Sequence, residues 1–218
     1  LHLHLNRGEA TLSIDGSGGS LHRRGYRAAM GAAPLKENLA AGLIRLSSWD
    51  GQVPLVDPCC GSGILLIEAV SMALDQAPGL NRSFALEGWA DFDPDLWERE
   101  SKRAGQCRRN DLELPPVIGF EQDPHIADQA RSNIDAAGLN GLITIHTGSF
   151  EQQVLPDSPG VLVCNPPYGQ RLGADDDLEP LYRSLGQFAR QQASGWQLWL
   201  LSGNAAITGA LRLKACRR

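Results

Sequence analysis

The chain has 218 residues, of which 42% are hydrophobic and 21% are charged, and its formal net charge is −5. This composition is typical of an ordinary globular protein of one large or two small domains, and it excludes a protein that holds nucleic acid by bulk positive charge alone. The charge is uneven, because residues 1–36 carry five basic and two acidic side chains, a net +3, so that the remainder carries −8.

Targeting and cysteine signals are sparse. There is no apolar run as long as a membrane span and no signal peptide, so we expect a cytoplasmic protein with no membrane partner. The odd number of cysteines and the lack of a C-x-x-C pair argue against a disulfide framework or a zinc site, and we expect reduced thiols and no metal. The five cysteines are Cys59, Cys60, Cys107, Cys164 and Cys216.

The N-terminal part alternates apolar and polar residues over 1–14, which predicts a β-hairpin. Residues 15–33 are rich in Gly, Ser and Arg and are typical of a loop. We therefore divide the chain into 1–33, a hairpin and basic loop, and 34–218, the main domain. A helix is predicted from about Pro34, because Pro suits a first turn. The leucines at helical spacing after it are Leu35, Leu39, Leu43 and Leu46.

From residue 53 onward, short apolar runs alternate with helical segments. Strands are predicted over 53–57, 117–121, 142–146, 160–164 and 196–202, and helices over 62–75, 124–137, 177–192 and from 205. This order predicts an α/β fold with a mainly parallel sheet, helices on both faces and ligands at the carboxyl ends of the strands. Residues 76–116 break the pattern and are interpreted as an insertion over one edge, with a basic helical segment over 99–109.

The loop after the first of these strands has the sequence Asp57-Pro58-Cys59-Cys60-Gly61-Ser62-Gly63. Glycines allow a tight turn and close approach of a ligand, and amides at a helix start favour an anionic group such as a carboxylate. Asp57 can accept hydrogen bonds from an ammonium. An amino-acid moiety therefore fits better than a phosphate, since neither phosphate-binding spacing is present. A purely structural turn is the alternative.

The second of these strands ends in Glu121-Gln122-Asp123-Pro124. A carboxylate at this place commonly holds ribose hydroxyl groups. Asp123 is better explained as a helix cap because Pro124 follows it. Glu121 is therefore predicted to bind a ribose, with Gln122 beside the base, and a solvated acid is the alternative.

The fourth of these strands is followed by Asn165-Pro166-Pro167-Tyr168-Gly169. The two prolines fix the backbone, so that the Asn165 side chain and the Pro166 carbonyl are held as hydrogen-bond acceptors. Tyr168 offers a flat face on which a base can stack. Two acceptors beside an aromatic ring suit a base with an exocyclic amino group, whose positive charge during attack they would stabilise.

Together, the 57–63 loop, Glu121 and residues 165–169 resemble the class I S-adenosylmethionine-dependent methyltransferases that act on exocyclic amines. Arg24-Gly25-Tyr26-Arg27 and residues 33–40 narrow the resemblance to THUMP-associated bacterial RNA methyltransferases of the UPF0020 type. Within that group, the similarity is greatest to the 23S rRNA guanine-N(2) methyltransferases. The resemblance covers nearly the whole chain.

The resemblance implies a Rossmann-like class I methyltransferase fold with S-adenosylmethionine as cofactor. The cofactor-binding residues would be Asp57, Pro58, Cys59, Cys60, Gly61, Ser62, Gly63, Glu121, Gln122, Ser149 and Asn165. The residues that hold the target base would be Asn165, Pro166, Pro167 and Tyr168. In related enzymes the segment at Ala33-Pro34-Leu35 closes over the methionine end. One departure is Ser149, which stands where the family usually has an acid facing the adenine amine.

The predicted reaction is methyl transfer to the 2-amino group of a guanine in RNA, with 23S rRNA as the first choice. The alternatives are a tRNA guanine-N(2) methyltransferase, an adenine amino methyltransferase on RNA or DNA, and a cofactor-binding scaffold that has lost activity. RNA affinity is expected to come largely from a THUMP domain that this sequence lacks. The C-terminal strand pair of the fold is expected to be truncated.

Overall fold

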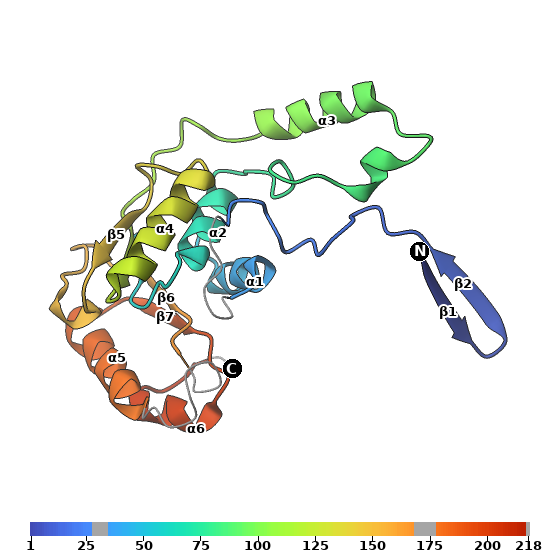
Figure 1. Ribbon diagram of the computed structural model, residues 1–218. Coiled ribbons are helices and arrows are strands. Elements are labelled where there is room, and N and C mark those ends of the chain that lie inside the picture. The colour runs from blue at the N-terminus through green and yellow to red at the C-terminus, as the bar shows by residue number, and fades with distance from the viewer. Residues whose placement is uncertain (28–34, 168–177, 217–218) are drawn as a thin grey trace.

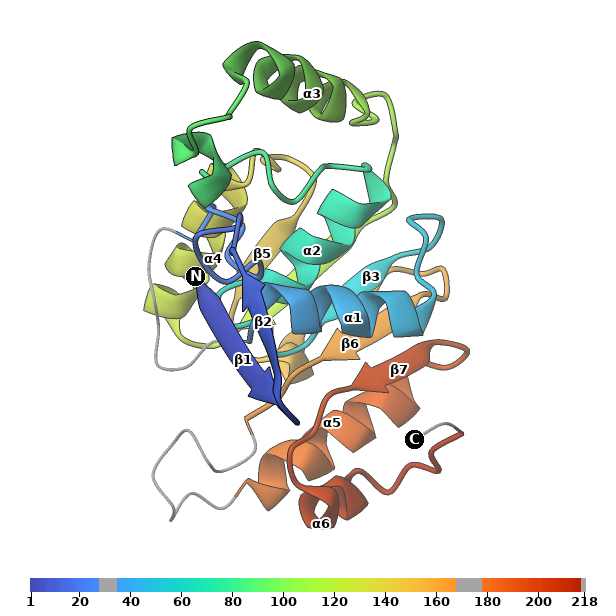
Figure 2. The ribbon, with the colours of Figure 1, turned by 90° about the vertical axis from the view of Figure 1, so that its right-hand side faces the viewer.

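The computed structural model describes residues 1–27, 35–167 and 178–216 (Figures 1 and 2). Its central sheet has five parallel strands in the order β5-β4-β3-β6-β7. They are β3 (Leu55–Asp57), β4 (Val117–Glu121), β5 (Thr144–Thr147), β6 (Val161–Cys164) and β7 (Gln197–Leu200). From β3 the chain adds β4 and β5 on one side, and it then returns to add β6 and β7 on the other side. The predicted doubly wound parallel sheet is thus confirmed, with its topological switch between β3 and β6.

Helices cover both faces of this sheet, and each face has its own apolar core. On one face lie α1 (Glu37–Ser47), α2 (Ile64–Ala73) and α4 (Pro124–Ala136), and on the other α5 (Glu179–Gln192), α6 (Ala205–Thr208) and the 3-10 helix η3 (Gly209–Leu211). Strand β6 contributes to both cores, because Val161 and Val163 pack in the first and Leu162 and Cys164 pack in the second. Its continuous apolar run is what a strand buried on both faces requires. None of the described helices is long and apolar enough to cross a membrane.

Helix α4 begins as its sequence predicts. The Asp123 side chain accepts hydrogen bonds from the backbone N–H groups of His125 at 2.8 Å and Ile126 at 3.4 Å. Pro124 occupies the first turn, where backbone N–H groups have no intrahelical acceptor, so the N–H that proline lacks costs no hydrogen bond. These contacts confirm Asp123 as a helix cap and leave the neighbouring Glu121 available for another role.

Helix α1 departs from its predicted pattern. It begins at Glu37 rather than near Pro34, which lies outside the described residues. Leu39 and Leu46 are 53% and 65% exposed whereas Leu35 and Leu43 are buried, so the leucine spacing marks the buried face only in part. That face consists of Glu37, Ala40, Leu43, Ile44 and Ser47. The buried Glu37 carboxylate contacts His22 Nδ1 at 2.9 Å and the Arg27 guanidinium at 3.2 Å.

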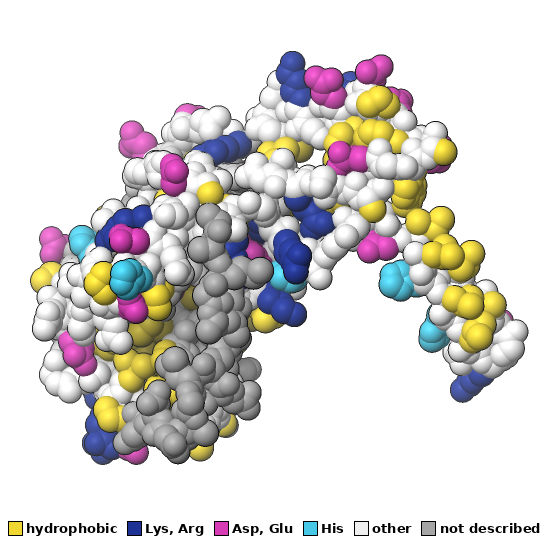
Figure 3. All heavy atoms as spheres, viewed as in Figure 1, with side chains coloured by type: hydrophobic (Ala, Val, Ile, Leu, Met, Phe, Trp, Pro, Cys, Tyr) yellow, Lys and Arg dark blue, Asp and Glu magenta, His cyan; other side chains and the backbone are white. Residues whose placement is uncertain are grey.

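The predicted N-terminal hairpin is present as β1 (His2–Asn6) and β2 (Glu9–Ser13). Arg7 and Gly8 connect the strands with φ values of +48° and +84°, as a tight hairpin turn requires. Every residue of both strands is exposed, including the apolar pair Leu3 and Leu12. The hairpin projects from the body of the molecule, and its apolar side chains are visible in Figure 3.

The segment between α2 and β4 contains the 3-10 helix η1 (Ala85–Gly88) and α3 (Pro94–Gln106). Helix α3 starts and ends earlier than the predicted 99–109 and has no buried residue. Arg82 binds this segment to the N-terminal loop. Its guanidinium lies 4.7 Å from the Phe84 ring centroid and donates to four carbonyl oxygens of residues 17–23, at 2.9 to 3.4 Å. Residues 17–23 are therefore ordered against residues that lie about sixty positions later.

Candidate functional site

A cavity of about 500 Å³ lies at the carboxyl ends of the strands, lined by the loops that follow β3, β4, β5 and β6. Its place at the topological switch is where doubly wound sheets bind ligands, and its volume is within the roughly 300–1,000 Å³ of ordinary ligand pockets. Of the residues predicted from the sequence, those that line it are Asp57, Pro58, Cys59, Cys60, Gly61, Ser62, Glu121, Gln122, Ser149, Asn165, Pro166 and Pro167. Four loops far apart in sequence thus meet at one cavity.

Two residues of the predicted set stand apart from this group. Gly63 does not line the cavity but begins α2 in a left-handed conformation, with φ +81°. A Cβ added there would lie 3.4 Å from the Cβ of Ala130, so Gly63 lets α2 and α4 approach closely. Tyr168 lies outside the described residues.

Asp57, at the end of β3, is 1% exposed. Its Oδ1 accepts a hydrogen bond from the Cys59 amide at 3.0 Å, whereas its Oδ2 is buried without a hydrogen-bond partner. Burial raises the pKa of this carboxyl to about 8; the charge of Glu121 adds to the shift, and hydrogen bonding by the Cys59 amide and the Cys164 thiol opposes it. A cationic group reaching Oδ2 would favour the charged form and lower this pKa.

Glu121, at the end of β4, bridges two loops of the site. Its Oε2 accepts from the Gly61 amide at 3.1 Å and its Oε1 from the Asp123 amide at 2.9 Å. The loop after β3 is held further by the Cys60 amide, which donates to the Phe120 carbonyl at 3.0 Å. These two hydrogen bonds fix the position of the carboxylate. Each Glu121 oxygen keeps a second lone pair, so the carboxylate can still accept a hydrogen bond from a ligand.

Asn165, directly after β6, presents a second acceptor. Its Oδ1 is buried and has no hydrogen-bond partner. Pro166 and Pro167 follow it in the cavity wall and can donate no amide hydrogen bond. Because an unsatisfied buried acceptor costs free energy, the two orphaned oxygens on Asp57 and Asn165 indicate a ligand that brings hydrogen-bond donors.

Ser149 lines the cavity after β5 and caps the 3-10 helix η2 (Phe150–Gln152). Its hydroxyl accepts from the Glu151 amide at 3.4 Å and donates to the Glu151 carboxylate at 3.3 Å. The side chain is therefore engaged locally, and adenine recognition by Ser149 stays a prediction.

All five cysteines are free thiols. Cys59 and Cys60 line the cavity, and burial raises the pKa of Cys60 and of Cys164. These two thiols are therefore protonated at neutral pH and behave as small apolar groups. Within the described residues, no group of three His, Cys, Asp or Glu side chains is arranged to hold a metal ion.

The remaining cavity wall was not predicted from the sequence. It is largely apolar and comprises Ile64, Leu65, Phe120, Ile126, Gln129, Gly148, Phe150 and Leu181, with the cap residue Asp123. Leu35, which the family resemblance places near the methionine end of the cofactor, also lines the cavity. In the sequence, such side chains cannot be told from core residues. The position of Gln129, in the second turn of the helix that Pro124 begins, is the signal that could have suggested a polar contact from α4.

The basic segment near the N-terminus has a different role from the one its charge suggests. Arg24 pairs with the buried Glu68 at 3.3 Å, and Arg27 pairs with the buried Glu37 at 3.2 Å. Both guanidinium groups are thus neutralised, with side-chain exposures of 18% and 14%. These two arginines are therefore neither solvated side chains of a loop nor free to pair with a phosphate.

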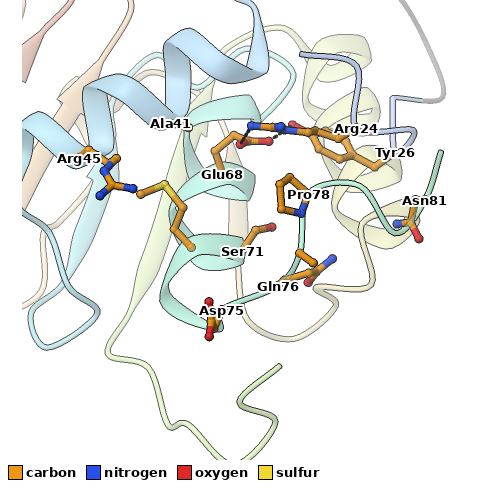
Figure 4. A pocket seen from close by; sticks show the side chains of 12 residues that line it. Arg24, Tyr26, Ala41, Arg45, Glu68, Ser71, Asp75, Gln76, Pro78 and Asn81 are labelled. Carbon is orange, nitrogen blue, oxygen red and sulfur yellow. Dashed lines mark hydrogen bonds and ion pairs between the residues drawn. The ribbon is translucent and has the colours of Figure 1, made fainter. Parts of the chain in front are cut away.

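A second cavity, of about 350 Å³, lies beside the later turns of α2 (Figure 4). Arg24, Tyr26 and Glu68 form a hydrogen-bonded group in its wall, and Arg45 and Asp75 stand at other positions around it. Its walls carry both charge signs, and it shares no lining residue with the first cavity.

Comparison with known proteins agrees with this architecture. A "Ribosomal RNA large subunit methyltransferase K/L" of Chromohalobacter salexigens is 43% identical over 226 residues, which covers 99% of this chain and 31% of that protein. A Listeria monocytogenes protein described as a predicted N6-adenine-specific DNA methylase has a crystal structure that superposes with a TM-score of 0.90 at 36% identity. The structure of SMU.472 complexed with SAH gives a TM-score of 0.88 at 35% identity. Each of these structures covers 99% of this chain and 56% of the other.

The chain spans between about a third and just over half the length of the relatives it matches. A family model described as the RMKL-like methyltransferase domain of UPF0020 matches residues 24–218. This match takes in the sheet, both helical layers and every loop of the first cavity. The chain therefore belongs to the UPF0020 family of RMKL-like methyltransferase domains.

Proposed function

We propose that the protein transfers a methyl group from S-adenosylmethionine to the exocyclic 2-amino group of a guanine in RNA, with 23S rRNA as the substrate. The observation that carries the proposal is the pair of buried, unpartnered acceptors, Asp57 Oδ2 and Asn165 Oδ1, on loops of one cavity. One is suited to the ammonium of the cofactor and the other to the amine of the base. The RNA methyltransferase name of the Chromohalobacter salexigens relative supports RNA as the substrate class.

The residues present fit S-adenosylmethionine. Gly61 has φ +53°, and a Cβ placed on it would meet no atom within 4 Å, so the loop leaves open space where a ligand can approach the backbone. Asp57 would accept from the ammonium group, and the amides at the start of α2 would favour the carboxylate. Glu121 would accept from the ribose hydroxyl groups, with Gln122 beside the adenine. Relatives of this fold support the assignment, since SMU.472 was crystallised with SAH.

The protein would promote methyl transfer through the residues that hold the amino group of the target base. S-adenosylmethionine, when bound, supplies an electrophilic methyl group on a sulfonium. The guanine amine is a poor nucleophile because its lone pair is delocalised into the ring. Asn165 Oδ1 and the Pro166 carbonyl would each accept one of its N–H groups, which favours a pyramidal nitrogen and stabilises the positive charge that develops during attack. The surplus proton leaves after transfer, so no strong base is required.

A second candidate is an adenine amino methyltransferase. The description of the Listeria monocytogenes structure favours it, and an adenine N6 amine would meet the same two acceptors. In either case the amine is hidden inside a duplex, so the target base must be unpaired or flipped out of its stack. A tRNA guanine would satisfy the same site and remains a third substrate to be tested.

The site assignment is tested by calorimetric titration with SAH and by methyl-transfer assays on total bacterial RNA. Asp57→Ala and Glu121→Ala should each weaken SAH binding by about tenfold or more, because each removes a hydrogen-bonded charged group. Asn165→Ala should bind SAH with a Kd within a few fold of the unaltered protein and transfer no methyl group. Unchanged SAH affinity in both acid variants, or surviving turnover in Asn165→Ala, would refute the assignment.

A further inference from the structure

Glu37, in the first turn of α1, is a carboxylate with only 3% of its surface exposed. Two side chains from residues 22–27 bind it: His22 Nδ1 lies 2.9 Å from Oε2, and Arg27 Nη2 lies 3.2 Å from Oε1. A buried carboxylate without such partners is strongly destabilising. The paired Glu37 therefore fixes the start of α1 against residues 22–27.

The same guanidinium reaches the wall of the first cavity. Arg27 Nη2 donates a hydrogen bond to the Leu35 carbonyl oxygen at 2.9 Å. Leu35 is 7% exposed and lines the cavity together with Ile64 and Leu65, from the first turn of α2. One nitrogen atom thus joins the helix start at Glu37 to the backbone of a cavity residue.

We propose that Arg27 and Glu37 are positioning residues for cofactor binding. They hold Leu35 in the wall of the cavity that takes S-adenosylmethionine, and so lower the Kd of the cofactor without touching it. This inference rests on the proposed function of that cavity. It assigns the second arginine of the Arg24-Gly25-Tyr26-Arg27 motif to cofactor affinity rather than to phosphate contact.

The chain provides a matched control in the same segment. Glu68 of α2 is 4% exposed, pairs with Arg24 Nη2 at 3.3 Å and accepts from the Tyr26 hydroxyl at 3.0 Å (Figure 4). It is a buried carboxylate of the same kind, held by the same stretch of chain. It lines the second cavity and not the first, and neither of its two partners bonds Leu35.

The test is the Kd of SAH, measured by calorimetry together with the Tm of each variant. Arg27→Met and Glu37→Gln should raise the Kd by about tenfold, equivalent to about 1.4 kcal/mol. Glu68→Gln should lower the Tm to a similar degree while the Kd stays within about twofold of the unaltered protein. Arg27→Lys should regain most of the affinity, because a lysine ammonium can still donate to both the Leu35 carbonyl and Glu37.

Two results would overturn the inference while leaving the proposed function intact. One is an unchanged Kd in folded Arg27→Met and Glu37→Gln proteins. The other is a Kd that rises equally in Glu68→Gln, which would mean that affinity merely follows stability. Failure of the unaltered protein to bind SAH would instead overturn the proposed function and this inference with it.

Discussion

Asp57 combines almost complete burial with a carboxylate oxygen that has no partner in the protein. Such a group destabilises the ligand-free fold when it is charged, because the hydrogen bonds from Cys59 and Cys164 offset only part of its desolvation. It suits a ligand that brings a positive charge to that oxygen. At this single residue, stability of the free protein and affinity for a cationic ligand are opposed.

This opposition predicts a pH dependence of stability. Burial raises the pKa of Asp57 from 3.8 to about 8, so between these values the folded state holds a proton that the unfolded state releases. The contribution of Asp57 to the free energy of unfolding is therefore largest below pH 4 and falls as the pH rises to 8, by up to about 1.4 kcal/mol per pH unit. Urea denaturation at pH 5, 6.5 and 8 measures it.

Asp57→Asn is the control for that measurement, since the amide does not titrate. The difference in unfolding free energy between the unaltered protein and Asp57→Asn should shift in favour of the variant as the pH increases. A difference that is constant across this range would show that Asp57 keeps an ordinary pKa in the folded protein.

For individual helices and strands, local sequence signals predict helix starts and buried strands well. Asp123 and Pro124 define the start of α4, and the apolar runs at 117–121 and 160–164 define two strands of the sheet. Helix α1 shows the limit of this reasoning. Its leucine spacing predicts a helix, but Leu39 and Leu46 are exposed, whereas Glu37 is buried against side chains of the preceding loop.

Two glycines at or within helices allow opposite predictions. Gly42, inside α1, has no atom within 4 Å of an added Cβ, so Gly42→Ala should raise the unfolding free energy by about 0.5–1 kcal/mol. Gly63 begins α2 at φ +81° and faces Ala130, so Gly63→Ala should lower it by about 1–2 kcal/mol. Chemical denaturation of both variants checks this pair, and a change of the same sign in each would contradict the helix geometry.

For the whole molecule, the net charges counted from the sequence are correct, but they do not show which basic side chains are free to bind a partner. The +3 of residues 1–36 includes Arg24 and Arg27, yet each is paired with a buried glutamate from a helix of the body. A sequence does not show that Glu37 and Glu68 face the interior, because both look like ordinary exposed helix residues. Most of the apolar cavity wall, such as Ile126 and Phe150, was not predicted, because in the sequence these side chains look like ordinary core residues.

Residues 1–36 offer RNA few unpaired positive charges, so we expect weak RNA binding through this segment. Within residues 1–36, the described basic side chains that are exposed and form no ion pair are Arg7, Arg23 and Lys36. Three phosphate contacts would give a plot of log K against log salt with a slope of about −2 to −3. Fluorescence anisotropy with labelled rRNA fragments between 50 and 200 mM salt measures it, and nanomolar binding that is insensitive to salt would contradict this prediction.

In the proposed reaction, a guanine amine of RNA accepts the methyl group. The most direct test incubates the protein with undermodified bacterial RNA and S-adenosylmethionine carrying a deuterated methyl group, then digests the RNA for nucleoside mass spectrometry. Asn165→Ala provides the inactive control. We expect deuterium to appear in N2-methylguanosine, chiefly in the 23S rRNA fraction. Label in N6-methyladenosine, with none in methylated guanosine, would contradict it.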